Sequence, residues 1–169
     1  MNAYEEIHQD LVETIAELIE ANRTTPVIVE GERDVRSLRA LGLEGEVIPL
    51  NAGVPLFNLA ESLSRRHTRA IILTDWDHRG GHLARLLRDA LEANQVRFDT
   101  EFRARLTYLC RKDIKDVESL AGFVERVSRQ VEGGWHGKAS KRFYAERKSH
   151  AVQDRRARRI LAKRPPRKE

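Results

Sequence analysis

Cysteine is nearly absent from this 169-residue chain, which contains only Cys110. A single cysteine excludes an internal disulfide and a cysteine-based zinc site, and its neighbours Tyr108 and Leu109 favour a buried thiol over a nucleophile. Long hydrophobic runs are also missing, since no stretch of about 18 apolar residues occurs and no membrane span is expected. The first residues lack the basic start and apolar stretch of a secretory signal. We therefore expect a cytoplasmic protein without a membrane partner.

Charge is unevenly distributed along the chain, although the net value is only +5, from 31 basic and 26 acidic residues. Residues 135–169 hold 13 Lys and Arg but three Asp and Glu, a net charge of +10. The remainder holds 18 basic and 23 acidic residues, a net charge of −5. An acidic body with a basic arm is typical of proteins that bind polyanions.

Short apolar runs alternate with amphipathic segments through most of the chain. The apolar runs predict four strands, over residues 26–30, 46–50, 69–74 and 105–110. Repeats of apolar residues at steps of three and four predict helices over residues 4–22, 33–41, 56–65, 83–91 and 117–131. This alternation predicts an α/β fold, with a central parallel four-stranded sheet flanked by helices.

The same pattern divides the chain into three parts. Residues 1–24 form a helix that packs on the domain, residues 25–132 form the α/β domain, and residues 133–169 form a basic, partly helical or disordered C-terminal arm. The glycine-rich stretch at residues 133–137 is the predicted hinge between the last two parts.

Two of the predicted strands end in acidic residues. Glu30 ends the first strand, whereas Asp75 ends the third and is followed two residues later by Asp77. The carboxyl ends of parallel strands meet at one edge of a sheet, and Mg²⁺ prefers oxygen ligands of this kind. Glycines at 31 and 80 would leave room for the backbone to approach a phosphate. The pattern alone leaves open that the Asp-x-Asp is a solvated turn or a helix cap.

The two segments Val27-Ile28-Val29-Glu30-Gly31 and Ile72-Leu73-Thr74-Asp75-Trp76-Asp77-His78-Arg79-Gly80 resemble the motifs of the Toprim family in type, order and spacing. The resemblance covers about residues 25–131. It is closest to small stand-alone archaeal Toprim proteins and to the Toprim domain of the ribonuclease that matures 5S ribosomal RNA. It implies a Toprim fold, which has a Rossmann-like central parallel sheet flanked by helices.

The resemblance also implies roles for individual residues. Glu30 would be a general acid/base or metal ligand, and Asp75 and Asp77 would bind Mg²⁺, with Mn²⁺ as a substitute. Asp34 would be a supporting acid. The implied function is Mg²⁺-dependent processing of nucleic-acid phosphodiesters, with a nuclease acting on RNA favoured over one acting on DNA.

An alternative is a non-catalytic or weakly catalytic nucleic-acid-binding accessory factor in RNA processing or in DNA replication and repair. Such a factor would work within a larger ribonucleoprotein or replication and repair complex. Under either reading, basic side chains would bind the phosphates, through contacts that are mostly independent of base sequence. The candidates lie beside the acids and in the arm: Arg79, Lys112, Lys115, Arg155, Arg156, Arg158 and Arg159. The arm could instead serve solubility or dock on the acidic body.

Overall fold

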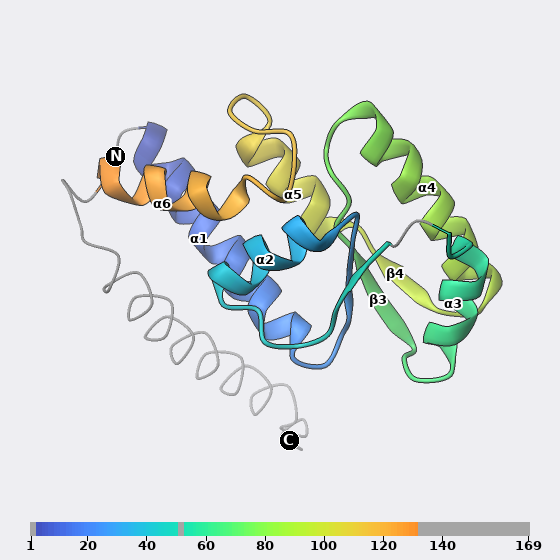
Figure 1. The fold of residues 1–169 in the computed structure, drawn as a ribbon. Helices are drawn as coiled ribbons and strands as arrows, with labels where there is room; N and C mark the ends of the chain where they lie inside the picture. Colours follow the sequence, from blue (N-terminus) through green and yellow to red (C-terminus); the bar gives the residue numbers. More distant parts are fainter. Residues whose placement is uncertain (1–2, 51–52, 132–169) are drawn as a thin grey trace, which may run out of the picture.

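The computed structural model describes residues 3–50 and 53–131 (Figure 1). In chain order the elements are α1 (Ala3–Asn22), β1 (Val27–Val29), α2 (Glu32–Leu41), β2 (Val47–Pro49), α3 (Leu56–Ser64), β3 (Arg69–Ile72), α4 (His78–Ala93), β4 (Arg97–Asp99), α5 (Glu101–Cys110) and α6 (Leu120–Val131). Among these helices, none is long and apolar enough to cross a bilayer.

The predicted arm at residues 133–169, with Arg155, Arg156, Arg158 and Arg159, lies outside the described residues. The domain limits inferred from the sequence therefore stay predictions.

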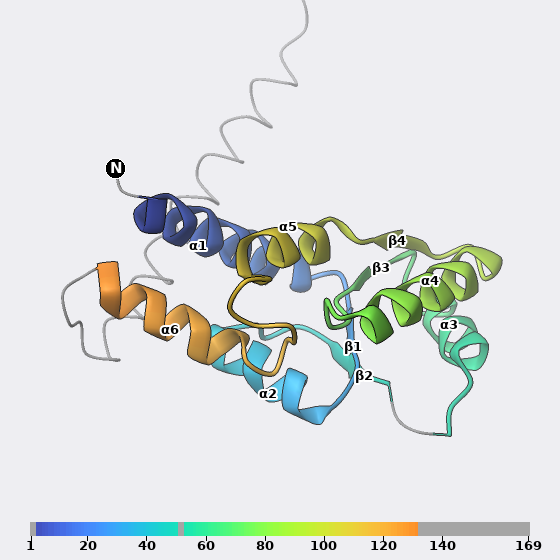
Figure 2. The ribbon, with the colours of Figure 1, turned by 90° about the horizontal axis from the view of Figure 1, so that it is seen from above.

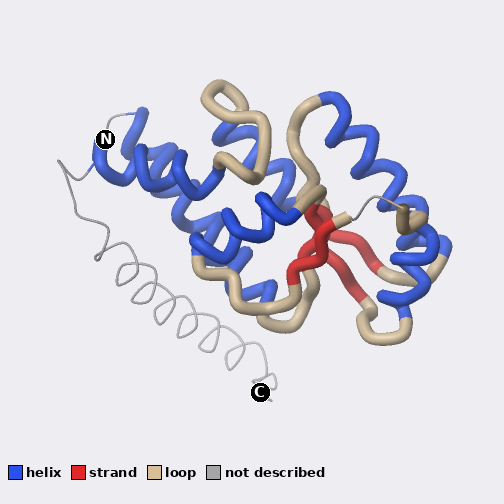
Figure 3. Tube along the Cα trace, in the orientation of Figure 1, coloured by secondary structure: helices blue, strands red, loops and turns tan. Residues whose placement is uncertain are grey.

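The strands form one parallel sheet in the order β2-β1-β3-β4. Val27 of β1 pairs with Val47 of β2 on one side and with Ile71 of β3 on the other, while Ile71 also pairs with Asp99 of β4. The predicted parallel four-stranded sheet is thus confirmed. Figure 3 shows these strands at the centre, with helices on both sides.

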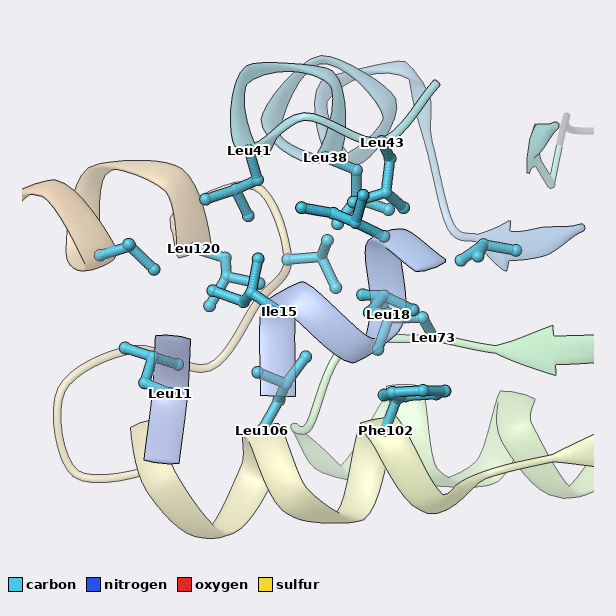
Figure 4. Packing of buried hydrophobic residues seen from close by; sticks show 14 of the residues in the cluster. Leu11, Ile15, Leu18, Leu38, Leu41, Leu43, Leu73, Phe102, Leu106 and Leu120 are labelled. Carbon is cyan, nitrogen blue, oxygen red and sulfur yellow. The ribbon is translucent and has the colours of Figure 1, made fainter. Parts of the chain in front are cut away.

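Each face of the sheet is covered by its own apolar cluster. Val27, Val29 and Ile71 point into the cluster formed with α1, α2, α5 and α6, of which Figure 4 shows a part. Alternate strand residues such as Ile28 and Ile72 point into a second cluster, formed with α3 and α4. The two helix groups lie on opposite sides of the sheet in Figure 2. Burial on both faces explains why β1 and β3 read as continuous apolar runs.

The predicted fourth strand at residues 105–110 is wrong, because this segment lies within the helix α5. Phe102, Leu106 and Cys110 are buried at steps of four, which is the period of a helix face and not of a strand. The fourth strand is instead β4, which has only three residues and is therefore too short to give a clear periodic pattern. Lys112 and Lys115 consequently follow a helix and not a strand.

Two predicted helix boundaries also differ from the structure. The apolar stripe at residues 83–91 marks only the later part of α4, which begins at His78 and includes Gly80 and Gly81 in its first turns. Helix α6 begins at Leu120, so the buried Val117 lies in the preceding loop. This loop position allows the backbone of Val117 to contact the site described below.

Candidate metal and phosphate site at the carboxyl edge of the sheet

The four acidic residues singled out from the sequence lie at the carboxyl edge of the two central strands. Glu30 follows β1, Asp34 lies in the first turn of α2, and Asp75 and Asp77 lie between β3 and α4. Because β1 and β3 are neighbours, the backbone N–H of Asp75 donates to Glu30 Oε1 at 3.1 Å, across 45 residues of sequence. The fold therefore brings Glu30 against the Asp75 turn.

Backbone N–H groups hold the other three carboxylates. Asp75 Oδ1 accepts a hydrogen bond from Val117 at 2.9 Å, and Asp34 Oδ2 accepts one from Gly31 at 3.0 Å. Asp77 Oδ1 accepts one from Gly80 at 2.7 Å, which makes Asp77 the N-cap of α4. The helix-cap reading of the Asp-x-Asp is thus correct for Asp77, but a carboxylate has a second oxygen that a cation can use. In the described part of the chain, none of the four acids forms an ion pair with Lys or Arg.

Burial and mutual repulsion make negative charge unfavourable here. Burial raises the pKa of Asp75 to about 7, with the charges of Glu30 and Asp34 acting in the same direction. Burial also raises the pKa of Glu30, against the hydrogen bond from Asp75, and the charge of Asp77 adds to the rise. The pKa of Asp34 is raised as well, first by burial. A bound cation would relieve all of these unfavourable interactions.

Arg103 of α5 is a site residue that the sequence reasoning missed. Its Nε donates to both the backbone oxygen and Oγ1 of Thr74 at 3.1 Å, and its Nη2 donates to the backbone oxygen of Asp75 at 2.7 Å. One guanidinium thus fixes the backbone that carries Asp75. No local pattern marks this residue, because its partners lie 28 and 29 positions away.

The turn between β3 and α4 closes tightly on itself. The hydroxyl of Thr74 donates to the backbone oxygen of Gly80 at 2.8 Å. A Cβ at Gly80 would lie 1.8 Å from the backbone oxygen of Asp75, so only glycine fits there. The space at Gly80 is thus filled by the protein's own backbone, not left for phosphate as predicted. At Gly31 a Cβ would meet nothing within 4 Å.

The loop after α5 is attached to this turn through Trp76. Trp76 Nε1 donates to the backbone oxygen of Ile114 at 2.6 Å, and its backbone N–H donates to that of Lys115 at 3.0 Å. The exposed Lys112 and Lys115 therefore lie in a loop that contacts the site, although the strand expected to bring them there does not exist. The exposed Arg79 is close enough for its charge to lower the pKa of Glu30.

The donor set fits a hard cation bound through few protein ligands. Among the described residues, no group of three or more His, Cys, Asp or Glu side chains is arranged to hold an ion by itself. Mg²⁺ commonly uses one or two carboxylates and keeps several waters. The oxygen-only donors at this edge suit Mg²⁺ or Mn²⁺ better than zinc, which prefers nitrogen and sulfur.

Known proteins resemble this chain in sequence and in fold. The Toprim domain family matches residues 25–108. The chain is 39% identical over 127 residues to the UPF0292 protein Mbar_A0484 of Methanosarcina barkeri, a match that covers 72% of this chain and 88% of that protein. It is 40% identical over 123 residues to a UPF0292 protein of Thermococcus sibiricus, covering 73% and 94%.

A solved structure of a protein from Aquifex aeolicus is also similar. Its TM-score is 0.56 at 26% identity, and the match covers 63% of this chain and 94% of that chain. The fold and the strand-end motifs define a Toprim-domain protein, which indicates a nucleic-acid-related function in general. The chain belongs to the UPF0292 family, and the predicted resemblance to small archaeal Toprim proteins is confirmed.

Proposed function

We propose that this protein is a metal-dependent nuclease that hydrolyses phosphodiester bonds, with RNA favoured over DNA as substrate. The observation that carries the proposal is the carboxyl edge itself. There Glu30, Asp34 and Asp75 all have raised pKa values and backbone hydrogen bonds, but no ion pair within the described chain. Structural carboxylates are usually paired, so this arrangement is expected where an external cation and phosphate bind.

Asp75 and Asp77 would hold Mg²⁺, or Mn²⁺ in its place, and Asp34 would support them by fixing the backbone of Gly31. When bound, the ion would act as a Lewis acid on the scissile phosphate. Burial raises the pKa of Glu30 above that of an ordinary glutamate, which suits a group that takes a proton from the attacking water or gives one to the leaving oxygen.

Basic residues would hold the substrate backbone on either side of the acids. Arg79 and the loop lysines Lys112 and Lys115 lie around this edge, and the arm adds Arg155, Arg156, Arg158 and Arg159. Such contacts neutralise phosphates without reading bases. The preference for RNA rests on the resemblance to the ribonuclease that matures 5S ribosomal RNA.

The test is a gel assay on labelled single- and double-stranded RNA and DNA, in Mg²⁺, Mn²⁺ and EDTA. Glu30→Gln and Asp77→Asn each keep an oxygen for the N–H groups of Asp75 and Gly80, so both should fold. We expect each to lower metal-dependent cleavage by about 100-fold or more, whereas the control Glu46→Gln keeps it. Cleavage that persists in both site variants would refute the proposal.

The second candidate function is a nucleic-acid-binding accessory factor. It is favoured by the structural use of the acids, since Asp77 caps α4 and Asp75 accepts a hydrogen bond from Val117. Binding that survives both EDTA and the two site substitutions, without cleavage of any substrate, would support this function.

A further inference from the structure

The Asp and Glu side chains of α1 give this helix a strongly negative charge. Its 20 residues include six carboxylates and neither Lys nor Arg: Glu5, Glu6, Asp10, Glu13, Glu17 and Glu20. One face of the helix is buried through Leu11, Ile15 and Leu18. Among the described helices only α3 also lacks Lys and Arg, and it holds a single acid, Glu61. The outer face of α4, for example, mixes Asp89 and Glu92 with Arg85 and Arg88.

A groove with a volume of about 440 Å³ lies between α1 and α5, which pack side by side. It is lined from α1 by Asp10, Glu13 and Thr14, and from α5 by Arg105, Tyr108 and Leu109. Tyr108 is 75% exposed, the largest value among the exposed large hydrophobic residues. The one basic side chain of the groove, Arg105, is already paired with Glu17 at 2.7 Å. We call this feature the α1–α5 groove.

We propose that, when no nucleic acid is bound, the basic segment at residues 138–164 of the same chain docks in the α1–α5 groove. The 38 residues after α6 contain the stretch with a net charge of +10, opposite in sign to the charge of α1. The segment also contains Phe143 and Tyr144, which supply apolar surface to match the exposed Tyr108. Charge and apolar complementarity thus both point to this occupant.

The position of α6 shortens the path from the arm to the groove. Ser128 Oγ, three residues before the end of α6, lies 3.1 Å from His8 Nε2 on α1. Asp10 is only two residues further along α1, and Figure 2 shows the end of α6 near the start of α1. A short tether gives an effective concentration on the order of millimolar. Exposed ion pairs that are individually weak can therefore act together to hold the segment.

Limited digestion of the full chain with trypsin tests the docking without reference to any nuclease activity. Mass spectrometry would follow the cuts within residues 138–164 at low salt. We expect Asp10→Asn/Glu13→Gln to accelerate these cuts several-fold, because the released segment is accessible. The matched pair Asp89→Asn/Glu92→Gln removes the same charge from α4 and should leave the rate unchanged. Equal rates in both pairs and the parent protein would overturn the proposal.

Zero-length carbodiimide coupling gives a second, direct readout. Lys138, Lys141, Lys148 and Lys163 should couple to Asp10 or Glu13, and 1 M salt, where the screening length falls to about 3 Å, should abolish the products. A mixture of isotopically labelled and unlabelled protein separates coupling within one chain from coupling between two chains. Products that lie mainly between chains, or mainly on Asp89 and Glu92, would contradict the proposal.

Discussion

At the amino edge of the sheet, Glu46 lies between Arg66 and His67, with contacts of 2.8 and 2.6 Å. Burial alone would raise the pKa of Glu46, but the hydrogen bonds from these two residues outweigh it and lower that pKa. At the carboxyl edge, Glu30 and Asp75 have backbone N–H partners instead, and their pKa values are raised, first by burial. The pKa of a partly buried carboxyl group is therefore lowered at the amino edge of the sheet and raised at the carboxyl edge.

Glu46 stabilises the fold as a carboxylate, because its cationic partner Arg66 belongs to the same chain. Glu30 and Asp75 are instead unfavourable in their charged form, because burial raises their pKa values. Both are positioned by backbone groups and by Arg103, which binds the backbone of Thr74 and Asp75 and forms no ion pair with the acids. Such unpaired charge is expected where a cation is supplied from outside.

The largest expected effect comes from the turn that positions the acids at the carboxyl edge. Gly80→Ala would place its Cβ 1.8 Å from the backbone oxygen of Asp75, so the turn must shift. We expect a loss of about 2–4 kcal/mol in the free energy of unfolding, measured by urea denaturation. In the control Gly81→Ala, the nearest atom to the new Cβ is Arg103 Nη2 at 3.7 Å, so stability should change little. Equal effects of the two substitutions would refute the described turn.

Loss of Arg103 should mainly weaken metal binding. Arg103→Met removes the three hydrogen bonds that fix Thr74 and Asp75, so the half-saturating Mn²⁺ concentration should rise about 10-fold, equivalent to about 1.4 kcal/mol. Arg103→Lys keeps the charge and can donate to one acceptor, and should restore part of the affinity. Arg111→Met, an exposed position at the end of the same helix, is the control. Metal affinity unchanged in Arg103→Met would show that its role is purely structural.

The smallest expected effects are changes in the free energy of unfolding when a carboxylate is neutralised, and their sign differs between the two edges of the sheet. The pKa of Asp75 rises to about 7 in the folded state, from about 3.9 when unfolded. Between these values the folded protein holds a proton that the unfolded chain has lost, so stability falls as pH rises through this range. In EDTA, Asp75→Asn should therefore stabilise the protein at pH 8 by about 1–2 kcal/mol, after allowance for solvent screening, and the gain should vanish towards pH 4.

Glu46→Gln should have the opposite sign at neutral pH. The lowered pKa of Glu46 contributes stability above the ordinary pKa of a glutamate, and that contribution is lost as pH falls through the folded value. We expect a loss of up to about 1 kcal/mol at pH 7, since the side chain is about one-third exposed. Urea unfolding of Asp75→Asn and Glu46→Gln from pH 4 to pH 8 checks the comparison. If both substitutions changed the free energy of unfolding in the same direction at pH 8, the comparison would be contradicted.

The sequence predicts the strands that carry the acids because β1 and β3 are buried on both faces and therefore apolar throughout. The fourth strand could not be found in the same way. Strand β4 has only three residues and lies at the edge of the sheet. The apolar residues of α5 were mistaken for a strand because their spacing of four residues was overlooked. The positions of Glu30 and Asp75 follow from strand ends, but Arg103 and Val117 reach Asp75 through contacts 28 and 42 residues apart. Such contacts leave no local pattern.

The most direct test of the central claim, that the carboxyl edge of the sheet binds a divalent cation, is titration of the protein with Mn²⁺, with free Mn²⁺ measured by electron paramagnetic resonance. We predict binding that strengthens from pH 6 to pH 8, as Asp75 loses its proton. Asp75→Asn and Asp77→Asn should abolish this binding, and Glu46→Gln should leave it intact. Equal binding in all four proteins, or none in the parent protein, would contradict the account.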